Sequence, residues 1–367
     1  MHRVLTPAKA NELAMGGYLR TGVTLPEELT HRIQRHFHDK PSTANNWYEI
    51  FNADRSGVKN VASQAGTSKG NKKPVAKKEK LEATMRTQAA FNDNKYTRNI
   101  YADFELLRPI MHQLFQGGVR ELFTSRYMVI THDIFLSLSR NQTGFQGRHW
   151  DVFTKQQPFE GPLDLSFYIP LTRTNASVGG RLGVLPRTKL ELSAANATRL
   201  PLTAMKRVAT DHPNFKLDTI FRDTLDMSGR PAAPSDGDNE AISKYEKAYA
   251  TGAMEANKEM ARVRRINGRA DWKFASSAPG EVLIFAQKEF HEAEAYHGSG
   301  KGDKALRDVY VIRMAPLYDI PVQLPSTLGG KPANCHVLDF KRGTLTRHRE
   351  GVNIADFPEE QRHNIFF

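Results

Sequence analysis

Short runs of β-branched and aromatic residues, bounded by Gly and Pro and not separated by helical patterns, are the feature that most constrains the fold. These runs predict strands at residues 127–130, 134–138, 165–171, 181–185, 281–285 and 308–312. A doubly wound parallel sheet needs a helix between successive strands, and this chain does not show that alternation. The order of the runs therefore favours an antiparallel sandwich or jelly roll.

Helical patterns lie mainly before residue 125 and are expected to pack outside the sheets. Thr6 and Pro7 predict the start of a helix that Gly16 and Gly17 end. Residues 104–123 place apolar side chains at helical spacing, which is typical of an amphipathic helix. The expected fold class is therefore α+β, with a mostly β core and flanking helices.

The chain is expected to divide into three parts. Residues 1–125 form a helical scaffold that contains a basic loop at 54–80, residues 126–320 form the core, and residues 321–367 form a C-terminal extension. Within the core, a proline-interrupted segment of about 191–278 carries its own polar helical pattern. This segment is expected to be an insertion.

The balance of charge favours anionic partners, because Lys and Arg outnumber Asp and Glu by 52 to 40. The lysines of the loop at 54–80 are not interleaved with the aromatic residues that stack on single-stranded nucleic acid, so a solvated loop is the preferred interpretation. No apolar run is long enough to span a membrane. The single cysteine, Cys335, is expected to be structural in a cytoplasmic protein.

One His-x-Asp pair stands out among the thirteen histidines: His149 has Asp151 two residues later. Residues two apart on a strand share a face, so both side chains can reach one metal ion. Two imidazoles and one carboxylate hold Fe(II) and leave coordination positions open for a co-substrate and O2. The pair alone is a weak signal, and it needs a second histidine from elsewhere in the chain.

Downstream motifs supply candidates for that histidine. His149-x-Asp151 is followed by the glycine-to-proline run at 180–186, the run at 279–285, and His297-Gly298-Ser299-Gly300, with Arg307 ten residues after the histidine. This order resembles the phytanoyl-CoA dioxygenase-like branch of the Fe(II)/2-oxoglutarate oxygenases. The sequence departs from that pattern at 187–189, where Arg-Thr-Lys replaces the usual Gly-Ser-His turn. Each motif is loose, and their order carries the resemblance.

The resemblance implies a double-stranded β-helix that uses Fe(II), 2-oxoglutarate and O2. It implies that His149, Asp151 and His297 bind the metal and that Arg307 binds the distal carboxylate of 2-oxoglutarate, which a guanidinium can hold bidentately. The implied reaction is C–H oxidation (hydroxylation, desaturation or oxidative cyclisation). With the positive charge of the chain, we expect a small anionic organic substrate.

Two site positions have alternatives. His291 lies at the usual short distance after Phe285 and is the alternative distal ligand. His291 and His297 are six residues apart, so strand alternation places them on the same face and does not decide between them. Arg313 is the alternative to Arg307, since it lies six residues later on the same face. The preferred interpretation of Arg313 is a strand-end arginine that reaches solvent.

The substrate and the function class also have alternatives. Arg140 and Gln142 lie on a predicted loop before the metal ligands and are candidate substrate contacts. The spacing of Arg307 and Arg313 also occurs in alkylation-repair dioxygenases, which keeps a nucleic-acid or protein hydroxylase or demethylase as an alternative. A non-catalytic jelly-roll binding protein is the third hypothesis.

Overall fold

The computed structural model describes residues 4–39, 95–99, 103–138, 163–186, 243, 271–287, 289–298, 306–318, 323–324, 327–328, 331–332, 335–348 and 352–363. The basic loop at 54–80 lies outside these residues, as do His149, Asp151, Arg140 and Gln142. In the described part of the chain, no helix has the length and apolar character needed to cross a membrane.

The described helices are α1 (Pro7–Gly16), α2 (Glu27–His38), α5 (Phe104–Gln116) and the 3₁₀ turns η2 (Val119–Leu122), η5 (Ile354–Asp356) and η6 (Glu359–Gln361). As predicted, α1 begins after Thr6 and ends at Gly17, whose φ of 80° is the left-handed conformation that favours glycine. The helix predicted at 104–123 is shorter than expected. Asp103 caps its first turn and Gly117 ends it.

The main sheet has the strand order β1-β7-β4-β9-β3-β13-β14, with β2 also paired to β3, and every pair is antiparallel. Its strands are β1 (Tyr18–Thr24), β2 (Lys95–Asn99), β3 (Tyr127–Leu138), β4 (Leu165–Pro170), β7 (Glu281–Ala286), β9 (Arg307–Pro316), β13 (Cys335–Asp339) and β14 (Thr344–His348).

A second sheet has the order β6-β5-β8, formed by β6 (Lys273–Ala275), β5 (Leu182–Val184) and β8 (His291–Ala293). Two short pairs complete the described strands: β10 (Gln323–Leu324) with β15 (Val352–Asn353), and β11 (Thr327–Leu328) with β12 (Lys331–Pro332).

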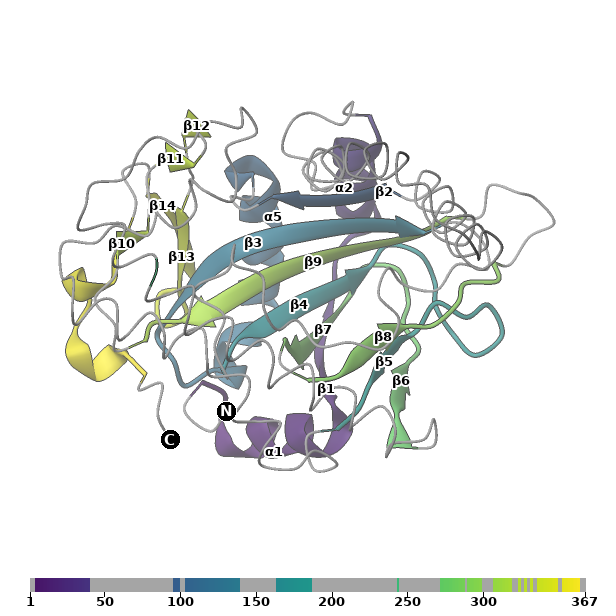
Figure 1. The fold of residues 1–367 in the computed structure, drawn as a ribbon, viewed down its shortest axis with the longest axis horizontal. Coiled ribbons are helices and arrows are strands. Elements are labelled where there is room, and N and C mark those ends of the chain that lie inside the picture. Colours follow the sequence, from purple (N-terminus) through teal and green to yellow (C-terminus); the bar gives the residue numbers. More distant parts are fainter. Residues whose placement is uncertain are drawn as a thin grey trace, which may run out of the picture.

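The chain passes repeatedly between the two sheets. It runs from β4 in the main sheet to β5 and β6 in the second, then returns to β7, crosses to β8 and returns to β9 (Figure 1). In the main sheet, β9 lies between β3 and β4. This alternation is the topology of a jelly roll, or double-stranded β-helix. The expected fold class is confirmed.

Four features of the fold differ from the sequence predictions. The strands predicted at 127–130 and 134–138 form one strand, β3, which is interrupted by an irregular register after Ile130. Strand β1 was not predicted, although it pairs with β7 along the edge of the main sheet. The last residues of the expected insertion form β6. In the expected C-terminal extension, β13 continues the main sheet beside β3.

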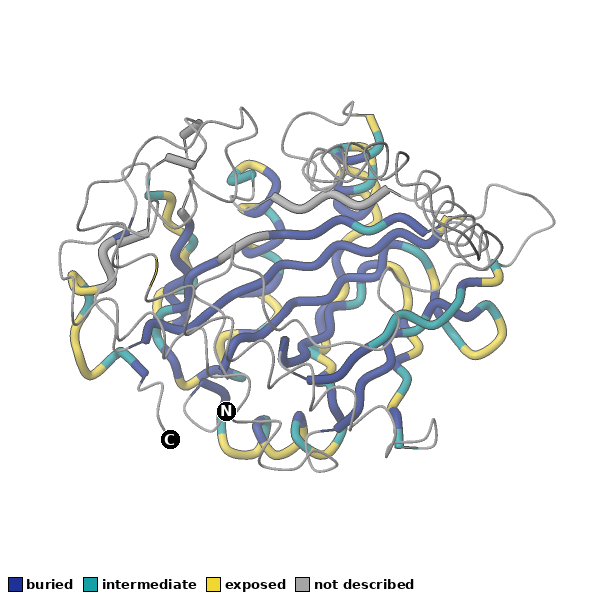
Figure 2. The backbone as a smooth tube through the Cα atoms, in the orientation of Figure 1, coloured by how far each residue is buried: buried dark blue, intermediate teal, exposed yellow. Residues whose placement is uncertain are grey.

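Strand β9 is buried along its whole length (Figure 2), and its alternating side chains face two different buried regions. Tyr310 and Ile312 face the large core that includes the apolar faces of α2 and α5. Val309 and Val311 face the smaller core between the two sheets. That core also contains Ile134, Tyr168, Leu182, Val184, Ala275, Leu283 and Phe285. Arg307 and Arg313 are an even number of residues from Val309 and Val311 and therefore share their face of β9. Both arginines thus lie on the inner face of the jelly roll.

Candidate active site

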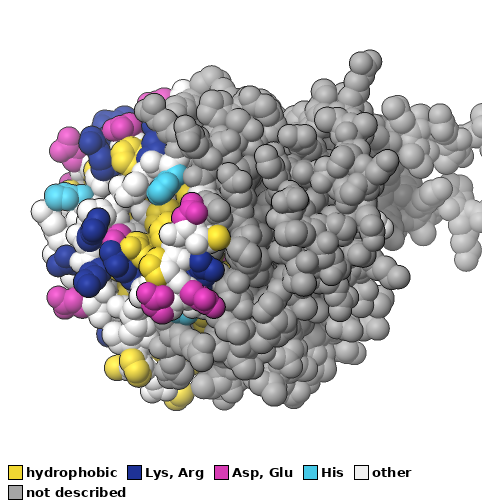
Figure 3. Space-filling view, turned by 90° about the vertical axis from the view of Figure 1, so that its left-hand side faces the viewer, with side chains coloured by type: hydrophobic (Ala, Val, Ile, Leu, Met, Phe, Trp, Pro, Cys, Tyr) yellow, Lys and Arg dark blue, Asp and Glu magenta, His cyan; other side chains and the backbone are white. Residues whose placement is uncertain are grey.

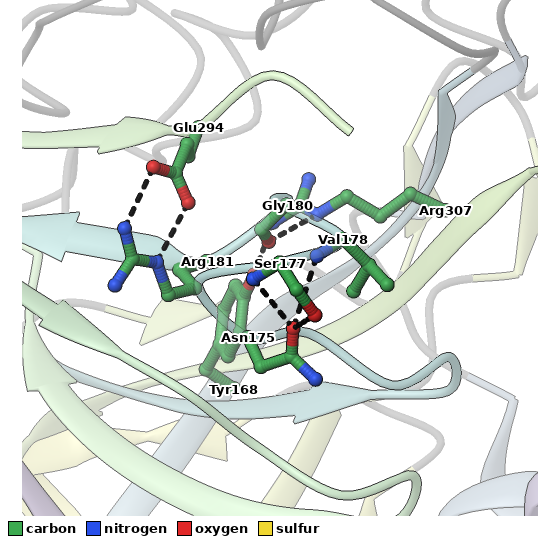
Figure 4. Close-up of polar contacts among 8 residues, drawn as sticks. All are labelled: Tyr168, Asn175, Ser177, Val178, Gly180, Arg181, Glu294 and Arg307. Atoms are coloured by element: carbon green, nitrogen blue, oxygen red, sulfur yellow. Dashed lines mark hydrogen bonds and ion pairs between the residues drawn. The ribbon is translucent and has the colours of Figure 1, made fainter. Parts of the chain in front are cut away.

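Arg307 is the first residue of β9 and lies inside the jelly roll, 1% exposed. Its Nε donates a hydrogen bond to the carbonyl oxygen of Gly180 (2.6 Å), and its Nη2 donates to the hydroxyl of Tyr168 (Figure 4). Its Nη1 is buried and has no hydrogen-bond partner among the described residues. A buried charge without a counter-ion is costly, so this guanidinium is suited to a carboxylate ligand.

Tyr168 on β4 adds a second donor to the same place. Its hydroxyl accepts from Arg307, and no described residue accepts the proton that the hydroxyl itself carries. Burial raises the pKa of Tyr168, and the nearby positive charge of Arg307 opposes this effect without reversing it. The hydroxyl is therefore protonated at neutral pH. One carboxylate could accept from both Arg307 and Tyr168, which would satisfy two buried donors.

Gly180 allows the backbone to approach Arg307 this closely. A Cβ at this position would lie 2.9 Å from Cδ of Arg307 and 2.9 Å from Cδ2 of Tyr296. The φ of Gly180 is +74°, a conformation that L side chains rarely adopt. Glycine is thus required here for two independent reasons, close approach and backbone conformation.

The loop before Gly180 is held by Asn175. Its Oδ1 accepts hydrogen bonds from the backbone N–H groups of Ser177 (2.9 Å) and Val178 (3.0 Å), and from the hydroxyl of Ser177 (2.7 Å) (Figure 4). Such a turn stabilises a compact loop through one side chain. The Gly180 carbonyl that orients Arg307 therefore belongs to a structured loop.

Arg313 lies on the same inner face, six residues along β9, and is 6% exposed. The interpretation as a strand-end arginine that reaches solvent is therefore wrong. Its Nη1 donates to Oε1 of Gln287 (3.4 Å). Ser166 lies opposite Arg313 in the strand register, and its Oγ is buried without a hydrogen-bond partner among the described residues. Six residues of strand separate the two arginine Cα atoms by about 20 Å.

The two candidate histidines lie in different surroundings. His291 is the first residue of β8, is 7% exposed, and has its ring 5.0 Å from that of Phe285. Its Nδ1 lies 2.9 Å from the backbone oxygen of Glu289. Because a carbonyl oxygen only accepts, Nδ1 carries the hydrogen, and Nε2 has the lone pair in the neutral ring. This arrangement suits a metal-binding imidazole.

His297 lies beyond the end of β8 and is exposed. Its backbone N–H donates to the carbonyl of Val178 (2.7 Å), and a Cβ on Gly179 would lie 3.2 Å from its ring carbon Cδ2. His297 thus sits beside the glycine pair that precedes β5. Because no regular strand spans both histidines, the expectation from strand alternation that they share a face does not apply.

The predicted metal pair and the predicted substrate loop are not placed, since His149, Asp151, Arg140 and Gln142 lie outside the described residues. Among the residues that are described, no three His, Cys, Asp or Glu side chains gather as a metal site. The sequence predictions missed Tyr168 and Gly180 as members of the site. Tyr168 lies in a predicted strand and Gly180 lies just before another, but nothing local indicates that they converge on Arg307.

Charges on the described surface are mixed in sign. On the side of the molecule shown in Figure 3, Lys and Arg side chains are interspersed with Asp and Glu. The exposed pair of Glu105 and Arg108 on α5, 3.4 Å apart, is another example of such pairing on the described surface. The net positive charge of the chain therefore does not translate into a uniformly basic surface on this side.

The sequence matches no protein-family model and no curated protein sequence. Solved structures resemble the fold. AviO1 from Streptomyces viridochromogenes Tue57 has a TM-score of 0.39 at 13% identity, over 84% of this chain and 93% of AviO1. SnoK, a non-heme alpha-ketoglutarate-dependent carbocyclase from nogalamycin biosynthesis, has a TM-score of 0.37 at 11% identity, over 84% of this chain and 83% of SnoK.

HygX from Streptomyces hygroscopicus, solved with nickel and 2-oxoglutarate bound, has a TM-score of 0.35 at 10% identity, over 85% of this chain and 87% of HygX. One of these neighbours depends on 2-oxoglutarate, and another binds it. The chain is a double-stranded β-helix. Because all three TM-scores are below 0.5, that assignment rests on the strand order described above.

Proposed function

We propose that this chain is an Fe(II)- and 2-oxoglutarate-dependent oxygenase, an oxidoreductase that acts on a small organic molecule. The observation that carries the proposal is the pair of Arg307 and Tyr168. Inside a jelly roll, it presents two buried donors, Nη1 and the phenolic hydroxyl, for which the described residues supply no acceptor. A carboxylate bound there would neutralise the arginine and accept from both groups.

The distal carboxylate of 2-oxoglutarate fits this position. Arg307 supplies the charge, and Tyr168 supplies a neutral hydroxyl whose proton stays in place because burial raises its pKa. The carbonyl of Gly180 holds Nε and so fixes the plane of the guanidinium. The chain's own groups thus bind and orient the co-substrate before any reaction occurs.

For the metal we propose His149, Asp151 and His291. His291 is preferred over His297 because it is buried in the wall of the jelly roll, and because a backbone carbonyl fixes the orientation of its ring. His297 is exposed and is then a residue near the co-substrate pocket. When bound, Fe(II) supplies the activation of O2 that is coupled to oxidation of 2-oxoglutarate.

For the primary substrate we propose a small anionic molecule, oxidised at a C–H bond by hydroxylation, desaturation or cyclisation. Arg313 supports the anionic character, because it places a second guanidinium on the inner face beside the buried hydroxyl of Ser166. Arg140 and Gln142 are proposed to contact the substrate from the loop before the metal ligands. We propose a cytoplasmic location for the enzyme.

The test is an anaerobic titration of the full chain with Fe(II) and then with 2-oxoglutarate, followed by the weak visible charge-transfer band of the chelated co-substrate. We expect a saturable band, lost in His291→Ala and retained in His297→Ala. Arg307→Gln should need more 2-oxoglutarate for saturation, whereas Arg126→Gln, far from the pocket, should match the wild type. If the wild-type chain binds neither Fe(II) nor 2-oxoglutarate, a non-catalytic binding role is favoured.

A further inference from the structure

Asp308, the residue after Arg307, connects helix α2 to the start of β9. The carboxylate is buried, 4% exposed. Its Oδ2 accepts a hydrogen bond from Nε2 of Gln34 (3.0 Å) and lies 3.0 Å from Nε2 of His38. A carboxylate oxygen only accepts, so His38 is the donor in the second contact. Two side chains from the last turns of α2 therefore hold one carboxylate oxygen of Asp308 on β9.

The backbone of Asp308 is held by the residues that follow β4. Its N–H donates to Oγ1 of Thr172 (3.3 Å), and its carbonyl accepts from the N–H of Leu171 (2.9 Å). Both partners follow the end of β4, the strand that carries Tyr168. The start of β9 is thus fixed to β4 through its backbone and to α2 through a side chain.

The carboxylate depends on these few contacts. Its second oxygen, Oδ1, is buried and has no hydrogen-bond partner in the described part of the chain. His38 also packs edge-on against Phe135, with ring centroids 5.2 Å apart. Loss of Gln34, His38 or the Asp308 carboxylate would break the link between α2 and the start of β9, so the first residues of β9 could shift.

Such a shift would reach Arg307 directly. Neighbouring residues on a strand point to opposite faces, with Cα atoms about 3.8 Å apart. Asp308 points to the helices, and Arg307 points into the jelly roll. The guanidinium is held by the Gly180 carbonyl at 2.6 Å and by the Tyr168 hydroxyl, so a small displacement would break at least one contact.

We infer that Gln34, His38 and Asp308 form a positioning network for the co-substrate pocket, through which helix α2 sets the affinity for 2-oxoglutarate. The inference rests on the proposed function. Among the described residues, Gln34 and His38 hold the Asp308 carboxylate on the helix-facing side of β9, so the three side chains act through the backbone that carries Arg307. The network therefore controls binding of the co-substrate and not the chemistry that follows.

The experiment compares Asp308→Ala, Asp308→Asn and His38→Ala in the full chain loaded with Fe(II) under anaerobic conditions. Binding of 2-oxoglutarate is measured by titration, and KM for 2-oxoglutarate and kcat are measured from 2-oxoglutarate consumption in air. We expect Asp308→Ala to weaken binding about tenfold and to raise KM to a similar degree, with kcat unchanged at saturation. Asp308→Asn keeps an acceptor oxygen and should stay within about threefold of the wild type.

Two matched controls separate positioning from general destabilisation. His31→Ala changes a histidine of the same helix that is exposed and lies 3.9 Å from Glu27, and it should bind 2-oxoglutarate like the wild type. Tyr310→Phe removes a buried hydrogen bond to Asp133 on the helix-facing side of β9. It should lower stability without changing the affinity for 2-oxoglutarate.

The inference is overturned if a folded Asp308→Ala variant binds 2-oxoglutarate with wild-type affinity, or if kcat and Fe(II) binding fall together with co-substrate affinity. Should Asp308→Ala fail to fold, His38→Ala and Gln34→Ala decide by the same measurement. If the wild-type chain does not bind 2-oxoglutarate, the proposed function and the inference fail together. If it binds but the network variants do not alter the affinity, the inference alone fails.

Discussion

The guanidinium of Arg307 on β9 donates to the hydroxyl of Tyr168 on β4, and both groups are buried between the sheets. The two residues are 139 positions apart in the sequence. Each group keeps a donor for which the described residues provide no acceptor, so the pair is incomplete without a ligand.

Tyr168→Phe should weaken the response to 2-oxoglutarate. The substitution removes a hydroxyl donor from the proposed carboxylate site, and a hydrogen bond to a charged group contributes about 1.5–3 kcal/mol. Thermal unfolding of the Fe(II)-loaded protein, measured anaerobically with and without 2-oxoglutarate, should show a smaller ligand-induced rise in Tm than in the wild type. An equal rise in both proteins would remove Tyr168 from the site.

Gly180→Ala should disrupt the pocket, and Gly22→Ala is its matched control. Both glycines have positive φ, +74° and +78°, but a Cβ on Gly180 meets Arg307 and Tyr296 at 2.9 Å, whereas a Cβ on Gly22 meets nothing within 4 Å. Each alanine costs about 1–2 kcal/mol in backbone conformation. We expect only Gly180→Ala to lose 2-oxoglutarate binding in the anaerobic titration. Equal losses would show that backbone strain alone explains the effect.

Stability should fall at alkaline pH because of Tyr310. Burial, followed by the negative charge and the hydrogen bond of Asp133, raises the pKa of Tyr310 well above 10.0. The unfolded chain releases this proton near pH 10 and the folded chain does not, so the contribution is complete below about pH 10 and is lost as pH rises further. Urea unfolding at pH 9, 10 and 11 should show a shallower decline for Tyr310→Phe. If the stability of both proteins declined equally with pH, Tyr310 would not be the group responsible.

Arg181 and Glu294 should be energetically coupled. Arg181 donates to both carboxylate oxygens of Glu294, at 2.7 and 2.8 Å, and its guanidinium lies 5.0 Å from the centre of the Phe274 ring. The pair joins the chain before β5 to the chain after β8. A double-mutant cycle with Arg181→Ala and Glu294→Ala should give a coupling of about 1–2 kcal/mol in urea unfolding. Additive losses would show that the contact does not stabilise the fold.

Local sequence patterns predicted many of the elements that build the site. The runs at 165–171, 181–185, 281–285 and 308–312 correspond to β4, β5, β7 and β9, and β9 begins at Arg307, one residue before the predicted run. Alternation also placed Arg307 and Arg313 correctly on one face. These predictions succeeded because strand periodicity and glycine conformation depend on neighbouring residues.

Other predictions failed where the outcome depends on distant contacts. The predicted break within β3 was wrong because pairing with β9 continues across the bulge. Strand β1 was missed because its residues alone do not indicate a strand, and its extended conformation is defined by the pairing with β7. Arg313 is buried because it points to the inner face of the jelly roll, where it contacts Gln287 beyond β7, and its place near the end of a predicted strand could not indicate this.

The amino-acid sequence by itself determined strands β4, β5, β7 and β9, the bounds of helix α1, and the position of Arg307 and Arg313 on one face of a strand. Only the tertiary structure decided that Tyr168 and Gly180 converge on Arg307, and that His291 is enclosed while His297 is exposed. The physical reason is that periodicity is a property of neighbouring residues, whereas a binding pocket is formed by the register and crossing of strands far apart in the chain.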